Sequence, residues 1–180
     1  MGGLFLNKMT EKQIKQAIDS LIVLVDSRER LPNHITQAFD KYGVNWEKRK
    51  LKSGDYSAYI PKNEELGIIE ETNFENELCI ERKMSADEIS SNLSTNKERF
   101  HREFDRAEAK ILILIEDSTY EDIATGNFRS KLTPKQFLGL LHSFSFTHNS
   151  PFVFIPKSSS PLWIYNCFKY YFRNKLKQIK

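Results

Sequence analysis

The 180-residue chain has little of what defines several specialised protein classes. It has only two cysteines, Cys79 and Cys167, and their spacing fits no zinc site, so we expect two small buried side chains in a reducing compartment. No apolar stretch approaches the length of a membrane span, and the run 4–6 is too short for a secretory signal. The sequence therefore predicts a cytoplasmic protein without membrane contact.

A large excess of charge of one sign is also missing. The 27 basic and 24 acidic residues leave a net charge of +3, which permits nucleic acid as a partner without demanding it. Internal repeats and low-complexity tracts are absent too. A hydrophobic content of 39%, with 13 phenylalanines and 7 tyrosines, argues against disorder and is enough for one domain with a buried core.

Hydrophobic periodicity and capping signals predict alternating helices and strands, and hence the α/β class. Strands are expected at 21–25, 44–51, 55–60, 78–83, 111–115 and 152–155. Helices are expected after Thr10, at 32–41, from Ser85, from Thr95 or Asn96 to 110, at 134–146 and at 160–177. Residues 62–77 carry six glutamates and little periodicity apart from 66–69, which suits half of a hairpin. They are interpreted as an insertion.

Charged residues on two expected strands suit the hydrolysis of a phosphodiester. Asp55 follows Gly54, and Glu81 and Lys83 lie two positions apart on the strand 78–83, so they share a face while Arg82 points the other way. Two carboxylates can hold a divalent cation, and a lysine beside them can position or deprotonate water and offset transition-state charge. Taken alone, such a triplet is more often a surface ion-pair cluster.

Further motifs occur in order around this triplet. The chain contains Val-Asp-x-Arg-Glu at 25–29, Gly-Asp-Tyr at 54–56, Glu-Arg-Lys-x-x-x-Asp at 81–87 and Arg-Phe-x-x-Glu-x-x-Arg at 99–106. From about 21 to 172 it resembles the nuclease domain of the XPF family of structure-specific endonucleases. The resemblance implies a restriction-endonuclease-like fold, a central mixed sheet flanked by helices, over 21–180, preceded by a helical extension at 1–20.

The family resemblance also assigns roles in a site. It implies a nuclease that uses Mg²⁺ or Mn²⁺, with no small-molecule cofactor, in DNA repair or recombination. Asp55 and Glu81 would be metal ligands, with Asp26 as a third acid and the carbonyl of Arg82 as a further ligand, and Lys83 would orient water. For Asp26, the alternative is an Asx-turn acceptor at the end of its strand.

Three supporting residues have open interpretations. Arg28 and Glu29 either form an ion pair that orders their loop or contact phosphate. Asp87 falls in the first turn of a helix, where an acid favours the helix dipole. Its functional alternative is a pairing with Arg82 or Lys83 that orients them.

Basic residues in two places are candidates for DNA contacts. In the resemblance, Arg99 and Arg106 become anchors for phosphate or for a loop, although a charged helical face is normally just solvated. A second group surrounds a loop and a helix start, where phosphate binds well, and its alternative is an ordinary basic surface. That group comprises Arg129, Lys131 and Lys135.

The final expected helix carries an apolar stripe from Trp163 to Phe172. Core packing accounts for part of it, and family members dimerise at this end, so we expect a homodimer through this helix, with 134–146 as a second candidate element of the interface. The chain ends with the nuclease core, which suggests a stand-alone bacterial or phage type acting on branched DNA. The rival functions are a non-catalytic DNA-binding scaffold and an interaction protein, both disfavoured by the intact set of acids.

Overall fold

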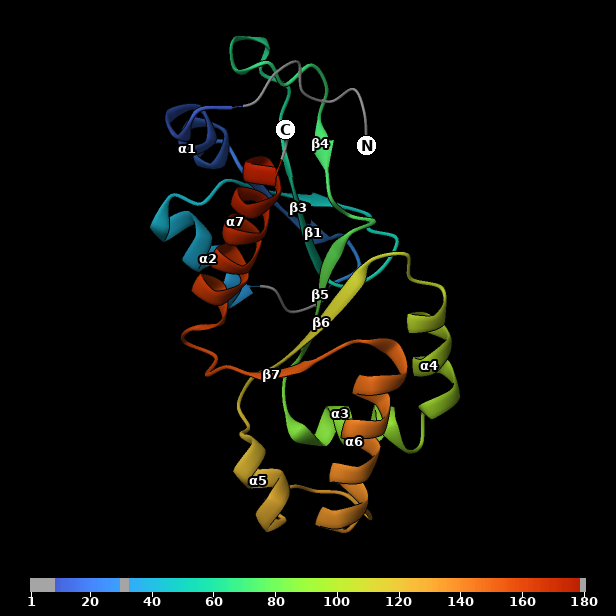
Figure 1. Cartoon of the computed structure of the whole chain (residues 1–180). Helices are drawn as coiled ribbons and strands as arrows, with labels where there is room; N and C mark the ends of the chain where they lie inside the picture. The colour runs from blue at the N-terminus through green and yellow to red at the C-terminus, as the bar shows by residue number, and fades with distance from the viewer. Residues whose placement is uncertain (1–8, 30–32, 179–180) are drawn as a thin grey trace. The chain divides into compact units, whose positions relative to one another are not determined.

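The computed structural model describes residues 9–29 and 33–178, which fall into two compact parts (Figure 1). The terminal part contains the residues up to Leu51, Tyr56–Glu75 and those from Pro161 onward. The central part contains Lys52–Asp55 and Asn76–Ser160. Helices and strands are interspersed along the chain, which confirms the α/β class.

The terminal part is built on a mixed set of strands. Strand β1 (Ile22–Asp26) pairs in parallel with β2 (Trp46–Arg49) and antiparallel with β3 (Tyr56–Ile60). A two-residue strand, β4 (Thr72–Asn73), pairs antiparallel with β3. Residues 23–26 of β1 and all of β3 are buried, as expected for strands that are covered on both faces.

The helices of the terminal part begin and end close to their predicted limits. Helix α1 (Glu11–Asp19) is capped by Thr10, whose hydroxyl accepts the amide of Gln13 in a capping box. Helix α2 spans Asn33–Tyr42, and the expected start at residue 32 lies outside the described residues. Helix α7 (Ser160–Gln178) buries Ile164, Phe168, Phe172 and Leu176, four positions apart.

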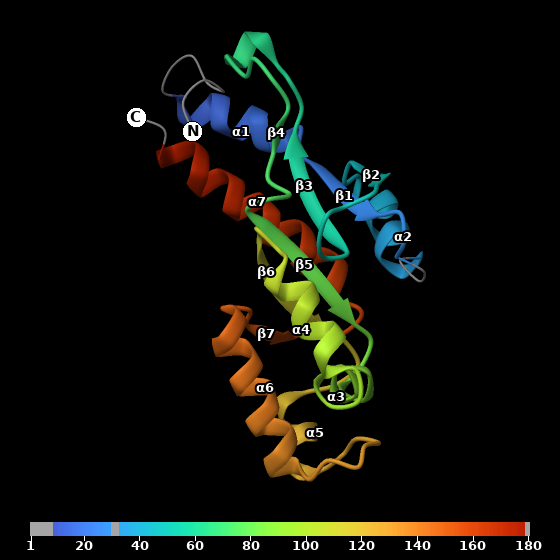
Figure 2. The same ribbon diagram turned by 90° about the vertical axis from the view of Figure 1, so that its right-hand side faces the viewer.

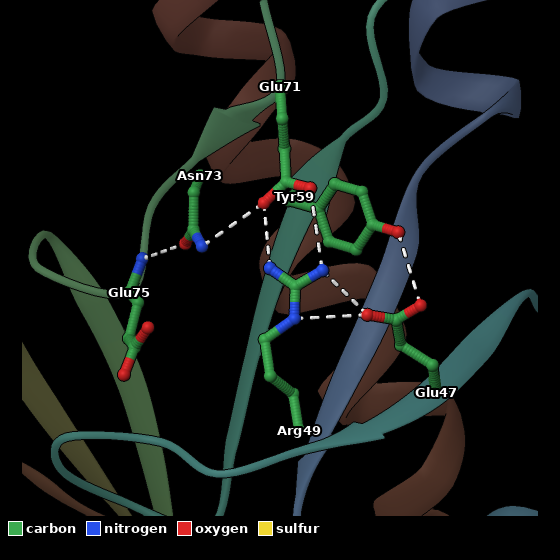
Figure 3. Close-up of polar contacts among 6 residues, drawn as sticks. All are labelled: Glu47, Arg49, Tyr59, Glu71, Asn73 and Glu75. Atoms are coloured by element: carbon green, nitrogen blue, oxygen red, sulfur yellow. Dashed lines mark hydrogen bonds and ion pairs between the residues drawn. The ribbon is translucent and has the colours of Figure 1, made fainter.

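The acidic segment 62–77 is ordered by contacts with the strands of the terminal part. It contains a 3-10 turn, η1 (Glu64–Leu66), and buries Ile68 and Phe74. The guanidinium of Arg49 contacts Glu71 Oε1 and Glu47 Oε1 at 2.7 Å each and lies 4.6 Å from the centre of the Tyr59 ring (Figure 3). One arginine thus neutralises two glutamates, Glu47 on its own strand and Glu71 in the acidic segment. This tertiary contact orders a segment whose local periodicity is irregular.

The central part contains three parallel strands. Strand β5 (Leu78–Lys83) pairs with β6 (Lys110–Ile115), which pairs with β7 (Phe152–Phe154). Figure 2 shows the chain running from β5 into α3 (Ala86–Leu93) and then α4 (Lys97–Asp105). The remaining helices are α5 (Tyr120–Thr125) and α6 (Pro134–His148), and α3 packs against both α4 and α6.

Two sequence predictions in the central part are wrong. The helix expected to reach residue 110 ends at Asp105, because Lys110 is already in β6 and its amide bonds the carbonyl of Glu77. Helix α5 was not predicted, although Thr119 and Asp122 form a capping box and Gly126 ends the helix in the left-handed conformation.

Among the described helices, none is long and apolar enough to cross a membrane.

Candidate active site

The alternation of side chains along β5 separates two charged groups. On one face, Lys83 Nζ lies 2.7 Å from Glu81 Oε1, and both side chains are mostly buried. On the other face, Arg82 Nη1 lies 2.9 Å from Glu116 Oε2, and Glu116 also accepts from the hydroxyl of Ser160. The predicted arrangement of this strand is confirmed, because successive side chains of a strand point to opposite faces.

Asp55 is held against β5 by backbone contacts. Its amide donates to the carbonyl of Ile80 at 2.8 Å, and its Oδ2 accepts the amide of Arg82 at 2.7 Å. Gly54 makes this approach possible: its φ is +69°, and a Cβ there would lie 2.8 Å from the Cβ of Cys79. The peptide between Glu81 and Arg82 therefore fixes the Asp55 carboxylate beside the Glu81–Lys83 pair.

Lys83 is enclosed by negative charge. Besides Glu81, its Nζ lies 3.6 Å from Glu88 Oε1 and 5.3 Å from the centre of the Phe100 ring. Burial of the side chain disfavours its charged form, but Glu81, Glu88 and Asp55 outweigh burial and raise the pKa of Lys83 above its ordinary value. The lysine is accordingly an ammonium at neutral pH, suited to donating hydrogen bonds rather than to removing a proton.

Glu88 is a residue of this site that the sequence analysis missed as a functional candidate. Its position after Ser85 fits a capping box, and Ser85 does cap α3. The Glu88 side chain, however, accepts the amide of Met84 at 2.8 Å through Oε2, which turns Oε1 toward Lys83. The capping signal predicted the helix start, and the lysine contact follows from the fold.

The pairing considered for Asp87 is wrong. Arg82 pairs with Glu116, Lys83 pairs with Glu81 and Glu88, and Asp87 Oδ1 instead accepts the backbone amide of Arg129 at 2.6 Å. Asp87 therefore ties the loop that precedes α6 to the first turn of α3. Because α3 directly follows β5, this contact brings the basic loop to the end of the strand that carries Glu81 and Lys83.

Asp26 orders the end of β1. Its Oδ1 accepts the amide of Arg28 at 2.6 Å, its Oδ2 accepts Arg28 Nη2 at 2.6 Å, and the amide of Leu51 lies 3.2 Å from Oδ2. Burial opposes ionisation, but these donors lower the pKa of Asp26 below its ordinary value. Arg28 pairs with Asp26, and Glu29 contributes its amide to the turn, at 3.0 Å from the Asp26 carbonyl. These contacts are those of the Asx-turn interpretation.

The basic candidates lie at the surface of the central part. Arg99 pairs with Glu103 across one helical turn at 3.1 Å and its side chain is 81% exposed, so its charge is available for other contacts at little cost. Arg106 is the exposed C-cap residue of α4, and the remaining three lie around the loop held by Asp87. Those three exposed residues are Arg129, Lys131 and Lys135.

The donor set at β5 is suited to a hard divalent cation. Asp55 and Glu81 offer carboxylate oxygens, and the described residues contain no group of three or more acid, histidine or cysteine side chains placed to hold a metal. Mg²⁺ commonly binds one or two carboxylates and keeps water or phosphate oxygens as its other ligands. Two carboxylates fit that pattern, with the Arg82 carbonyl as the further oxygen considered from the sequence.

The strands and the helices that flank them form an α/β fold of the restriction-endonuclease-like class. The family model of the ERCC4 domain matches residues 25–167, and the chain belongs to that family. The resemblance to XPF-family nuclease domains drawn from the sequence motifs is thereby confirmed.

Solved structures share the fold over most of the chain. XPF from Aeropyrum pernix matches with a TM-score of 0.57 and 16% identity, over 83% of this chain and 64% of that one. The same protein in complex with DNA matches with a TM-score of 0.58 and 16% identity, over 85% of this chain and 66% of that one. The chain thus spans about two thirds of the length of these relatives. A search of curated proteins gave no match.

Proposed function

We propose that the protein is a divalent-metal-dependent endonuclease that hydrolyses DNA phosphodiesters at branched or junction structures. The observation that carries the proposal is the arrangement at β5. There Lys83 Nζ lies 2.7 Å from Glu81 Oε1, and the backbone amide of Arg82 donates to Asp55 Oδ2 at 2.7 Å. Membership of the ERCC4 domain family and the likeness to XPF support it.

Each residue has a defined part in the proposed reaction. Asp55 and Glu81 would hold Mg²⁺ or Mn²⁺, which would supply Lewis-acid stabilisation of the phosphate and activation of a bound water. Lys83, as an ammonium, orients the attacking water and offsets negative charge on the phosphate in the transition state. Arg82 acts through its backbone, since its amide orients Asp55 while its side chain is anchored on Glu116. Asp26 accepts Arg28 through both carboxylate oxygens, and its part as a third acid stays a prediction.

The DNA is proposed to contact the basic surface of the central part. The Asp87–Arg129 contact holds the loop with Arg129 and Lys131 at the start of the helix that follows the site strand, and Lys135 lies in the first turn of α6. Arg99 and Arg106 extend the basic surface along α4. Phosphate contacts from lysine and arginine position a duplex without reading its sequence, which suits an enzyme that recognises DNA shape.

A homodimer is proposed as the working form. Much of the apolar stripe that was expected to form its interface is buried within the chain itself. Phe168 and Phe172 are buried, and Phe172 packs edge-on against Phe74 with 4.0 Å between the ring centres. Leu162 and Tyr170 remain more than half exposed on α7, so the proposed interface is this outer face. A monomer by light scattering at micromolar concentration would refute it.

A cleavage assay tests the activity. Purified protein, Mg²⁺ or Mn²⁺, and labelled flap, fork, four-way and linear DNAs are incubated, with Glu81→Gln and Asp55→Asn as matched variants that keep size and lose charge. The expected result is metal-dependent cutting of branched substrates that both variants lack, with DNA binding retained. Binding without cleavage by the parent would favour the non-catalytic scaffold, and equal cutting of linear and branched DNA would refute the junction preference alone.

A further inference from the structure

Lys83 lies between two carboxylates that hold it unequally. Its ammonium is 2.7 Å from Glu81 Oε1, a charge-assisted hydrogen bond, and 3.6 Å from Glu88 Oε1, which is an ion pair without a hydrogen bond. The lysine side chain is only 10% exposed, so bulk water does not compete with the two carboxylates for its ammonium. The ammonium therefore neutralises the carboxylate that the proposed function gives to a metal.

The carboxylate of Glu88 is oriented so that it can accept the ammonium of Lys83. The Met84 amide donates to Glu88 Oε2 at 2.8 Å, and that bond fixes the carboxylate with Oε1 turned to the lysine. Closing the gap from 3.6 Å to a charge-assisted hydrogen bond of about 2.8 Å requires a shift of less than about 1 Å. The Phe100 ring, 5.3 Å from Nζ, keeps favourable contact with the ammonium through such a small shift.

We propose that Glu88 is a positioning residue that receives Lys83 when a divalent cation binds Glu81, so that cation binding exchanges the lysine from one carboxylate to the other. The inference rests on the proposed role of Glu81 as a metal ligand. An ammonium and a divalent cation on one carboxylate repel each other, and in a buried site this repulsion is poorly screened. Glu88 lets the lysine retreat without leaving the place where it can act on water and phosphate.

The exchange makes opposite predictions for the two residues. Lys83→Met removes the internal cation that occupies Glu81 and should raise Mn²⁺ affinity by about 10-fold. Glu88→Gln keeps an oxygen for the Met84 amide, removes the second charge that attracts the lysine, and should lower Mn²⁺ affinity by about 5-fold. The second effect must disappear in the Lys83→Met background, to within about 2-fold, because no lysine remains to be received.

Titration calorimetry with MnCl₂ on the full chain measures these affinities without any turnover. Asp87→Asn is the matched control: it removes one acid from the same first turn of α3, and Asp87 contacts the Arg129 amide rather than Lys83. Its effect on Mn²⁺ affinity should be equal with and without Lys83. Equal effects of Glu88→Gln in both backgrounds would overturn the exchange, because they would mean that Glu88 acts only as a nearby charge.

Failure of the exchange and failure of the proposed function are distinguishable. If the parent does not bind Mn²⁺, or Glu81→Gln binds it as tightly as the parent does, the metal site itself is wrong. If Glu81→Gln weakens binding but Glu88 and Lys83 show no coupling, only the exchange is overturned. Should Lys83→Met not fold by circular dichroism, the ¹⁵Nζ resonance of Lys83 decides: it must shift on Mg²⁺ addition in the parent, and to a different position in Glu88→Gln.

Discussion

Arg82 and Glu116 form an ion pair on the face of β5 opposite to Glu81 and Lys83. Its Nη1 and Oε2 atoms are 2.9 Å apart, and the two side chains are 4% and 1% exposed. The amide of the same arginine orients Asp55 at 2.7 Å. One residue thus connects a buried charge pair on one face of β5 to a proposed metal ligand. Its buried side chain constrains the position of the backbone that contacts Asp55.

Breaking this pair should cost more than replacing it. Arg82→Met or Glu116→Leu removes one charge of the pair while the other stays buried, and should lower the free energy of unfolding by about 3–5 kcal/mol. The double variant removes both charges and should recover most of that loss, since apolar side chains can fill the same space. Urea unfolding followed by circular dichroism measures all four proteins. Additive losses in the double variant would contradict the pairing.

Gly54→Ala should be damaging for two separable reasons. The residue has a φ of +69°, and an added Cβ would lie 2.8 Å from the Cys79 Cβ and 3.1 Å from the Ile80 carbonyl oxygen. We expect a loss of about 1–3 kcal/mol in stability, together with a loss of activity as Asp55 is displaced from β5. Gly43→Ala is the control, since its φ is +66° with nothing within 4 Å of the added atom. Equal losses in both variants would show that only backbone strain matters.

Lys83→Ala should lower turnover more than it changes DNA affinity. The ammonium is proposed to act on water and phosphate in the transition state, and the loss of one such group costs about 10²–10³-fold in kcat. Lys83→Arg should not restore the rate, because a planar guanidinium does not fit between Glu81 and Glu88 as an ammonium does. Single-turnover cleavage and DNA anisotropy separate the two effects. A parent-like rate in Lys83→Ala would remove the lysine from the mechanism.

His148 should make stability depend on pH. Burial and the neighbouring His101, whose Nδ1 is 2.7 Å from His148 Nε2, lower the pKa of His148, and Asp105 opposes them only in part. Below the ordinary value of about 6.5 the unfolded chain takes up a proton that the folded chain resists, so stability falls as pH decreases. The slope cannot exceed about 1.4 kcal/mol per pH unit for one proton.

The test compares unfolding free energies between pH 7.5 and 5.5. His148→Gln should flatten this pH dependence, because it removes the imidazole whose pKa burial and His101 lower. Identical slopes in the parent and in His148→Gln would assign the acid sensitivity to other groups.

The sequence by itself determined what depends on short-range geometry. The opposite directions of Arg82 and Glu81 follow from the two-residue period of any strand, and β5 spans Leu78–Lys83 as expected. The cap at Thr10 follows from hydrogen bonding within a single turn. The ordered motifs were sufficient for the family, because a series of spaced motifs constrains a fold more than any one of them.

The tertiary structure decided which charges meet. Asp87 contacts an amide 42 positions away rather than Arg82 or Lys83, and Arg82 finds Glu116 at a separation of 34. The segment 62–77 looks irregular locally, yet Arg49 anchors it through Glu71, 22 positions away. Local periodicity sets the face on which a side chain lies, but the partner on that face depends on how distant elements pack, and a charged side chain accepts many partners at similar free energy.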